Sequence, residues 1–166
     1  MIRLCDFQSS KKYNLIYRAS QDGFEANDFH SKCDQKPNTL IIIKSEHESI
    51  FGGYTEQDWS GNGYRNDPKS FIFSFVNQMN FAPLKMKCSS NKSIYSSQSY
   101  GPIFGSGPAF RIHHNSNQNR ESLSSLGITS CNFKQPYYAD NSIKAKYFLA
   151  GSPNFKVLEI EAYTLE

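Results

Sequence analysis

Four aliphatic residues stand in succession at positions 40–43, inside the segment TLIIIK (39–44), and this run constrains the fold more than any other feature. A strand that is apolar on both faces lies in the interior of a sheet and is covered on each side. A tight turn over 46–49 leads into a second predicted strand, 50–55 (IFGGYT). Its paired glycines, Gly52 and Gly53, indicate a bulge or a close approach of another part of the structure to the backbone.

Short strands separated by turn residues are predicted along the rest of the chain. Alternation is clearest where Leu84 and Met86 face one way and Lys85 and Lys87 face the other. Further strands are expected at 13–18, 71–76, 93–95, 103–104, 109–113 and 155–163, with one helix near 27–34 that begins at Asn27 as its N-cap. The predicted fold class is therefore mainly β (α+β), a two-sheet antiparallel β-sandwich with short flanking helices. A closed barrel is the competing architecture.

Length and composition fit a single domain. The chain has 166 residues, enough for one substantial core, and its aromatic content of 14% suits sheet-on-sheet packing. The net charge of +3 comes from dispersed lysines and arginines, so no nucleic-acid-binding patch is predicted. The aliphatic run is far shorter than the ~20 residues that span a bilayer, and the first ten residues lack the apolar stretch of a signal peptide.

The cysteines and histidines do not predict a metal or cofactor site. The four cysteines are too widely spaced for a CxxC pair: Cys5, Cys33, Cys88 and Cys131. We expect them to be reduced thiols in a cytoplasmic or nuclear protein. The adjacent His113 and His114 would point to opposite faces of a strand, so both cannot easily reach one ion.

Several segments, in the same order, resemble the TLDc domain of the oxidation-resistance protein family. They are LIYRASQDGF with FHSKC, TLIIIKS followed by IFGGYTEQDW, DPKSFIFSFVN, SIYSSQSYGPIFGSG and FLAGSPNFKVLEIEAY, which together cover most of 15–163. The resemblance divides the chain into a polar N-terminal segment, 1–12, and a TLDc-like domain, 13–166. Family members usually begin with a helix, which is expected to be truncated or lost in 1–12.

The resemblance implies a β-sandwich with flanking helices, found in eukaryotes and often attached to other modules. It implies protection against oxidative stress through binding and regulation of the vacuolar proton-pumping ATPase. It brings no established catalytic mechanism, so we expect a protein-interaction domain and not an enzyme. The protein is expected to be a monomer or a part of a longer multidomain protein, without a membrane span or a nucleic-acid partner.

Charged residues near strand ends are the first candidates for the partner-binding surface. Asp22 follows a predicted strand and precedes a glycine, where it either contacts a partner or bonds the backbone of its own turn. Arg18 is predicted to pair with Asp22 or with Glu161 as a structural ion pair. Glu159 and Glu161 share one face of the closing strand, opposite the face predicted for Leu158, and a solvated strand face explains them better than acid–base catalysis.

His30 and Cys33 permit a second interpretation, in which the chain is a cysteine-dependent peroxide-detoxifying enzyme. Such an enzyme needs a thiolate that forms below about pH 7.5 and a base within hydrogen-bond reach. The helical spacing instead places Cys33 on the buried face with Phe29 and leaves His30 nearer the rim. A buried, unreactive thiol is the preferred interpretation.

Trp59, the only tryptophan, completes the set of candidates. It stands between a strand and a glycine-rich loop, where core packing and an exposed interface anchor are comparable interpretations. The candidates for partner binding are Asp22, His30, Gly52, Gly53, Trp59 and Glu161.

Overall fold

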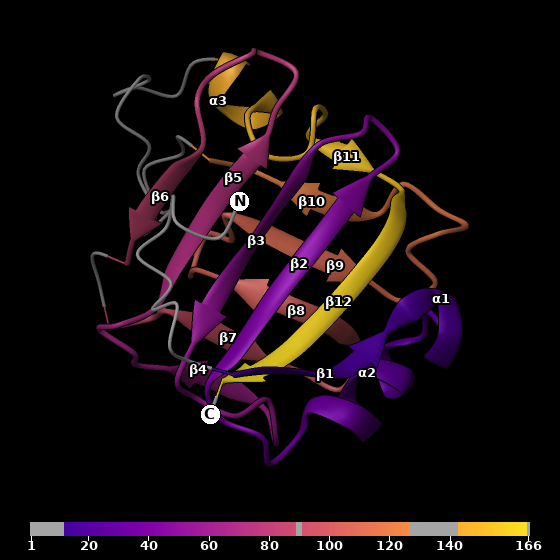
Figure 1. The fold of residues 1–166 in the computed structure, drawn as a ribbon, viewed down its shortest axis with the longest axis vertical. Helices are drawn as coiled ribbons and strands as arrows, with labels where there is room; N and C mark the ends of the chain where they lie inside the picture. Colours follow the sequence, from indigo (N-terminus) through magenta and orange to yellow (C-terminus); the bar gives the residue numbers. More distant parts are fainter. Residues whose placement is uncertain (1–11, 89–90, 127–142, 166) are drawn as a thin grey trace.

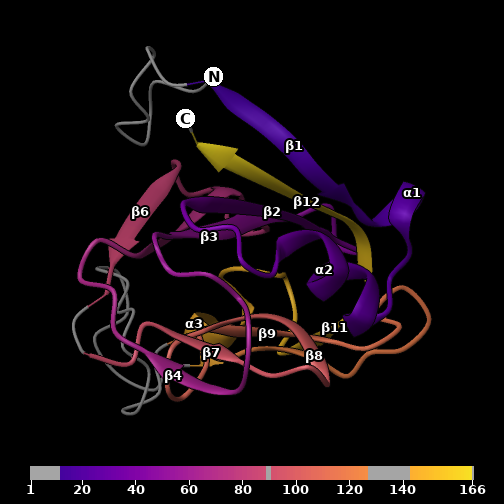
Figure 2. The same ribbon diagram turned by 90° about the horizontal axis from the view of Figure 1, so that it is seen from below.

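The protein is a sandwich of two antiparallel sheets, as the sequence predicts (Figures 1 and 2). The computed structural model describes residues 12–88, 91–126 and 143–165, so the predictions for the segment 1–12 fall almost entirely outside the described residues. The first sheet has the order β1 (Tyr13–Arg18), β12 (Val157–Leu165), β2 (Thr39–Ser45), β3 (Ile50–Thr55), β5 (Phe71–Val76) and β6 (Leu84–Lys87). The second has the order β11 (Asn154–Phe155), β10 (Ser122–Ser124), β9 (Phe110–His113), β8 (Tyr100–Phe104), β7 (Ile94–Ser96) and β4 (Gly63–Arg65).

The aliphatic run forms β2 in the interior of the first sheet, between β12 and β3, which confirms the central-strand prediction. Ile41 and Ile43 face the second sheet and are fully buried, whereas Leu40 and Ile42 join an aromatic cluster on the outer face. A strand with apolar residues on both faces is therefore placed where both faces are covered.

Aromatic rings fill the space between the two sheets. Phe51 of β3 meets Phe110 and Phe155 edge to face, at ring-centroid distances of 5.3 and 5.7 Å. Phe104 packs on Phe110 at 5.0 Å. Such pairs contribute about 0.5–1.5 kcal/mol each beyond the area that they bury, so these rings hold the first sheet on the second.

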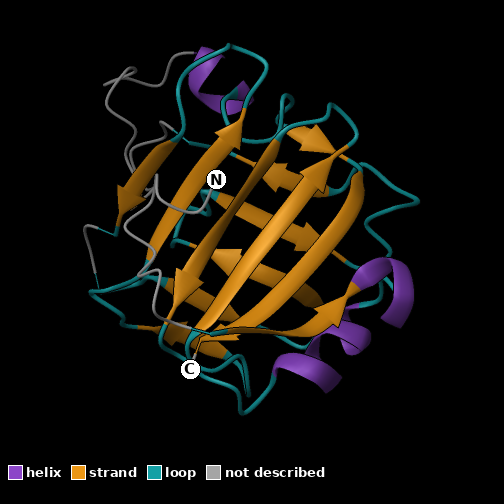
Figure 3. Cartoon of the chain, viewed as in Figure 1, coloured by secondary structure: helices purple, strands orange, loops and turns teal. Residues whose placement is uncertain are grey.

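The helices lie at the ends of the sandwich (Figure 3). α1 (Ala19–Asp22) and α2 (Ala26–Cys33) follow β1 directly and cover the end of the sandwich beside β1 and β12, with α2 reaching between the sheets (Figure 2). α3 (Ile143–Tyr147) lies at the opposite end. No helix among the described residues has the length and apolar character needed to cross a bilayer.

Local predictions were wrong in a few places. The N-cap of α2 is Glu25, two residues before the predicted Asn27, because the Glu25 N–H donates to Asp28 Oδ2 at 2.9 Å. A register shift between Val157 and Glu159 turns Leu158 outward, where it is 46% exposed, and Val157 inward. The sequence patterns did not indicate four short elements, all of five residues or fewer: α1, α3, β4 and β10.

Candidate functional site

The end of β1 and the two helices that follow it form a charged edge, here called the helical rim: Arg18, Asp22, Lys32, Glu159 and Glu161. The Arg18 backbone N–H donates to Asp22 Oδ2 at 2.8 Å, and Lys32 Nζ lies 2.9 Å from Asp22 Oδ1. The bond from Arg18, followed by that from Lys32, lowers the pKa of Asp22. The Asp22 side chain is 23% exposed and that of Lys32 46%, so a partner can reach this pair.

Arg18 joins β1 to the closing strand β12. Its Nε and Nη2 lie 2.9 and 2.7 Å from Glu161 Oε1, and the Tyr163 hydroxyl donates to Glu161 Oε2 at 2.7 Å. Burial, and then the bond to Glu161, raises the pKa of Tyr163. Glu159 Oε1 instead accepts from the Ser20 backbone N–H at 3.0 Å. Each of the two carboxylates therefore binds its own donors.

His30 lies in a separate polar pocket on α2. The ring is 3% exposed, with Nδ1 2.7 Å from Asp34 Oδ1 and Nε2 3.0 Å from the carbonyl oxygens of Ser97 and Tyr100. Carbonyl oxygens only accept, so Nε2 carries a proton. Beside the ring is an open, polar pocket of about 380 Å³ lined by Asn27, His30, Ser31, Asp34, Gln35 and Gln98. His30 thus fastens α2 to the β7–β8 turn.

Cys33 is inaccessible, with 0% exposure beneath α2. Burial raises the pKa of its thiol well above the ordinary value. The thiolate that a peroxide-consuming enzyme requires is therefore disfavoured. His30 directs both ring nitrogens at other partners. This geometry does not favour the cysteine-enzyme alternative.

Gly52, Gly53 and Trp59 are interior residues. A Cβ atom on Gly52 would lie 1.9 Å from the Ile41 carbonyl oxygen, and one on Gly53 would lie 2.6 Å from the Phe104 ring. The sequence predicted either a bulge or a close approach of another part of the structure to the backbone at these glycines. The structure shows the close approach. Trp59 is 0% exposed, and its Nε1 donates to Thr39 Oγ1 at 2.9 Å. Partner binding by these three residues stays a prediction, and their burial restricts it to an indirect effect through the fold.

The two adjacent histidines take separate partners. His113 Nδ1 lies 3.0 Å from Glu121 Oε2, whereas His114 Nδ1 accepts from the Ala26 backbone N–H at 3.3 Å. Within residues 12–88, 91–126 and 143–165, no three His, Cys, Asp or Glu side chains gather in a way that could hold a metal ion.

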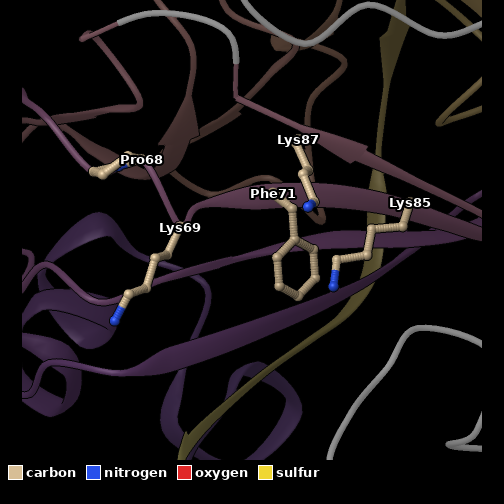
Figure 4. A pocket seen from close by; sticks show the side chains of 5 residues that line it. All are labelled: Pro68, Lys69, Phe71, Lys85 and Lys87. Carbon is tan, nitrogen blue, oxygen red and sulfur yellow. The ribbon is translucent and has the colours of Figure 1, made fainter.

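The sequence patterns did not indicate a pocket on the outer face of the first sheet. It is lined by Pro68, Lys69, Phe71, Lys85 and Lys87 (Figure 4). The alternation of 84–88 indicates which way the two lysines of β6 point. It does not indicate that β5 lies beside them, because that pairing depends on the register between two strands.

Comparisons with known proteins identify the family. A search of the curated proteins gives no match to this chain. The sequence model of the TLDc domain matches residues 1–166, which is the whole chain. The two-sheet fold is the one that the resemblance implies. The chain therefore belongs to the TLDc domain family.

Proposed function

We propose that this domain docks onto the vacuolar proton-pumping ATPase and regulates its assembly or activity, and that protection against oxidative stress follows from this contact. The observation that carries the proposal is the TLDc family match over the whole chain, since the family resemblance implies this partner. The site of action is the cytoplasm, at the surface of acidic organelles.

The helical rim supports a docking role because its charges are already fixed in place. Asp22 and Glu161 each have two or more donors, and both side chains are 23% exposed. A surface whose side chains are ordered before binding loses less entropy when a partner binds. Charges in fixed positions also select a partner with the complementary pattern. We therefore place the contact with the ATPase at the helical rim.

Two observations support a non-catalytic role. The rim carboxylates bind backbone, lysine and arginine donors. The thiol of Cys33 is buried and its pKa is raised. We expect iodoacetamide to alkylate Cys33 slowly in the folded chain at every pH up to about 8.5, the ordinary thiol pKa. Rapid alkylation with a midpoint below about 7.5 would revive the peroxide-detoxifying alternative.

Affinity enrichment tests the proposal. The tagged chain is recovered from a eukaryotic lysate, and ATPase subunits are quantified by mass spectrometry. The test variant combines Asp22→Asn with Glu161→Gln, and the matched control combines Glu48→Gln with Glu121→Gln, two acids whose side chains are 66% and 62% exposed. We expect about tenfold lower recovery for the rim variant, the size of one interface hot spot, and recovery within about twofold for the control.

Thermal melting of each variant precedes the enrichment, so that loss of fold is distinguished from loss of contact. If the folded wild-type chain enriches no ATPase subunit, the proposed function is wrong. If the rim variant and the control enrich the subunits equally, the ATPase stays the partner but the rim is not the contact.

A further inference from the structure

The loop that leads from β3 to β4 contains the one Asn–Gly dipeptide of the sequence, Asn62–Gly63. Asn62 is exposed and stands between two glycines with positive φ, Gly61 at +76° and Gly63 at +130°. Asparagine is a labile residue, because the backbone nitrogen that follows it can attack its side-chain carbonyl carbon. Glycine hinders this attack least, since it has no Cβ and permits many backbone conformations. This loop therefore has the residues that the reaction requires.

The surroundings of Gly63 leave room for such a reaction. A Cβ atom built on Gly63 would meet nothing within 4 Å. Gly63 is also the first residue of β4, a strand of three residues at the edge of the second sheet. The ends of short edge strands open at little cost in free energy. The backbone of Gly63 can therefore approach the Asn62 side chain without a clash at its own α-carbon.

The neighbouring strand polarises the amide of Asn62. The Tyr95 hydroxyl of β7 donates to Asn62 Oδ1 at 3.2 Å. Tyr95 is held in place by Tyr64, its opposite residue in β4, whose ring centroid lies 4.8 Å from its own. A donor at a carbonyl oxygen stabilises the negative charge that gathers there when a nucleophile adds to the carbon. Tyr95 therefore favours attack on Asn62 Cγ.

Asp22–Gly23 is the comparable dipeptide elsewhere in the chain, and its environment is protective. The Gly23 N–H donates to a carbonyl oxygen of α1 at 2.9 Å, and a Cβ atom on Gly23 would lie 2.0 Å from Asp28 Oδ2. The Asp22 carboxylate accepts from the Arg18 N–H and pairs with Lys32, and both contacts lower its pKa. A charged carboxylate is a poor electrophile, so both reacting groups are restrained here.

We propose that the fold makes Asn62 a modification site that deamidates spontaneously in the native state, and that it shields Asp22 from the corresponding reaction. The Gly63 nitrogen loses its proton to hydroxide and forms a bond to Asn62 Cγ. The bond from Cγ to Nδ2 then breaks, and Nδ2 takes a proton from water and leaves as ammonia. Water opens the resulting five-membered imide. Cleavage between the nitrogen and Cγ gives aspartate, and cleavage between the nitrogen and the main-chain carbonyl carbon gives isoaspartate.

Either product changes the surface at β4. Both place a carboxylate where a neutral amide stood, which lowers the net charge of +3 by one. Isoaspartate also adds one carbon to the main chain before Gly63, which displaces β4 relative to β7. Figures 1 and 2 both place β4 away from α1 and hence from the helical rim. Deamidation is therefore expected to leave docking at the rim unchanged, and its presence or absence does not depend on the proposed function.

Peptide mapping of the aged full chain tests the proposal. Folded protein and protein unfolded in urea are incubated side by side at mildly alkaline pH. Brief digestion with trypsin at mildly acidic pH, where deamidation is slow, cleaves after Lys44 and Arg65 and releases a peptide whose only asparagine is Asn62. Mass spectrometry measures deamidation, and synthetic peptides identify aspartate and isoaspartate by chromatography. The tryptic peptide that follows Arg18 reports isoaspartate at Asp22.

We expect the rate constant at Asn62 in the folded protein to lie within about threefold of its value in urea, because the loop is open. Isoaspartate at Asp22 should form at least about tenfold more slowly in the folded protein than in urea. Protection of Asn62 by more than about tenfold overturns the proposal. Formation of isoaspartate at Asp22 at the rate seen in urea overturns it as well, because the fold would then not select between the two dipeptides.

Variants locate the reaction and test the role of Tyr95. Asn62→Gln should abolish the mass change in this peptide, since a glutamine would have to form a larger ring. Asn66→Gln, at an exposed asparagine just after β4, is the matched control and should leave the rate at Asn62 within about twofold. A mass change that persists in Asn62→Gln would place the modification elsewhere and overturn the proposal.

Tyr95→Phe removes the donor to Asn62 Oδ1 and should slow deamidation about threefold, the effect of one exposed hydrogen bond. Faster deamidation in Tyr95→Phe would show that this bond restrains the amide, which overturns the activating role of Tyr95. Thermal melting of each variant verifies that it is folded before incubation begins.

Discussion

The two edges of the first sheet both carry cationic side chains, but these side chains have different neighbours. At the β1–β12 edge, Arg18 pairs with Glu161 and Lys32 pairs with Asp22. At the β5–β6 edge, Lys85 lies over the ring of Phe71. One edge has acid–base pairs beneath short helices, and the other has cations beside an aromatic surface.

The difference separates ion pairs between charged side chains from a cation–π contact between a lysine and a ring. Exposed ion pairs contribute about 0–1 kcal/mol each, so the pairs of the helical rim matter more for position than for stability. The Arg18–Glu161 pair joins β1 to β12, and the Lys32–Asp22 pair joins α2 to α1. Lys85 of β6 instead lies over the ring of Phe71, which is buried, so this cation contacts aromatic surface.

The largest effect is expected beneath the helical rim. Trp59→Ala removes a fully buried ring that packs on Phe29 and Phe104 at centroid distances of 5.5 and 5.7 Å, together with its bond to Thr39. We expect the free energy of unfolding to fall by about 3–5 kcal/mol, measured by urea denaturation. Tyr64→Ala, at a ring that is 49% exposed, is the control and should cost less than about 1 kcal/mol. Similar losses for the two variants would contradict the core role of Trp59.

The turn between α1 and α2 should give the next largest effect. Gly23 has φ +111°, and a Cβ atom there would lie 2.0 Å from Asp28 Oδ2, the atom that caps α2. Gly23→Ala should destabilise the fold by about 2–4 kcal/mol, from backbone strain and a disturbed cap. Gly63→Ala is the matched control, since Gly63 has φ +130° with nothing within 4 Å of the added atom. If both cost the same, the contact with Asp28 is irrelevant.

Acid should distinguish the two edges. The pKa of Asp22 is lowered from its ordinary value of 3.8, so its stabilisation is present above that value and is lost as the pH falls through the lower pKa of the folded state. The Tm advantage of wild type over Asp22→Asn should therefore shrink between about pH 5 and pH 2. The bond from Arg120 lowers the pKa of Glu46 to about 2. Wild type and Asp22→Asn both lose the stabilisation from Glu46 in acid, so it cancels in the Tm difference.

The lysine variants serve as the reference for this acid titration. The Tm difference between wild type and the Lys85→Gln, Lys87→Gln variant should stay constant over the same range, because neither substitution removes a carboxylate. A constant difference for Asp22→Asn would show that its donors do not stabilise the charged form.

The smallest effect on stability is expected at the β5–β6 edge. Lys85→Gln removes one cation–π contact and should cost about 0.5–1 kcal/mol in urea denaturation. Lys36→Gln, at an exposed lysine, should cost still less. A loss above about 2 kcal/mol for Lys85→Gln would mean that this lysine maintains the fold, and the contrast between the two edges would disappear.

Sequence patterns were sufficient to predict which strand lies inside the first sheet and which faces of the strands point inward. The aliphatic run at 40–43 is apolar on both faces and predicts an interior strand, and the alternation of Leu84 and Met86 with two lysines predicts which side faces inward. Both predictions are confirmed because they depend on the chain's own periodicity. The outward turn of Leu158 was missed because the register shift arises from pairing between strands.

The candidate site was harder to predict because it is assembled from distant parts of the chain. The sequence left the partner of Arg18 open between Asp22 and Glu161, and the pairing of β1 with β12 brings its side chain to Glu161, 143 positions away. His30 binds the carbonyls of Ser97 and Tyr100, which no local pattern indicates. The sequence did not decide whether Trp59 is buried or exposed. In the structure it packs against Phe104 of the second sheet and is fully buried.

Binding of the purified chain to purified vacuolar ATPase measures directly whether this TLDc domain docks through its helical rim, as we propose. We predict saturable binding that Asp22→Asn with Glu161→Gln weakens about tenfold, while Glu48→Gln with Glu121→Gln changes the Kd by less than about twofold. Absence of saturable binding by the folded, monodisperse wild-type chain would contradict the account.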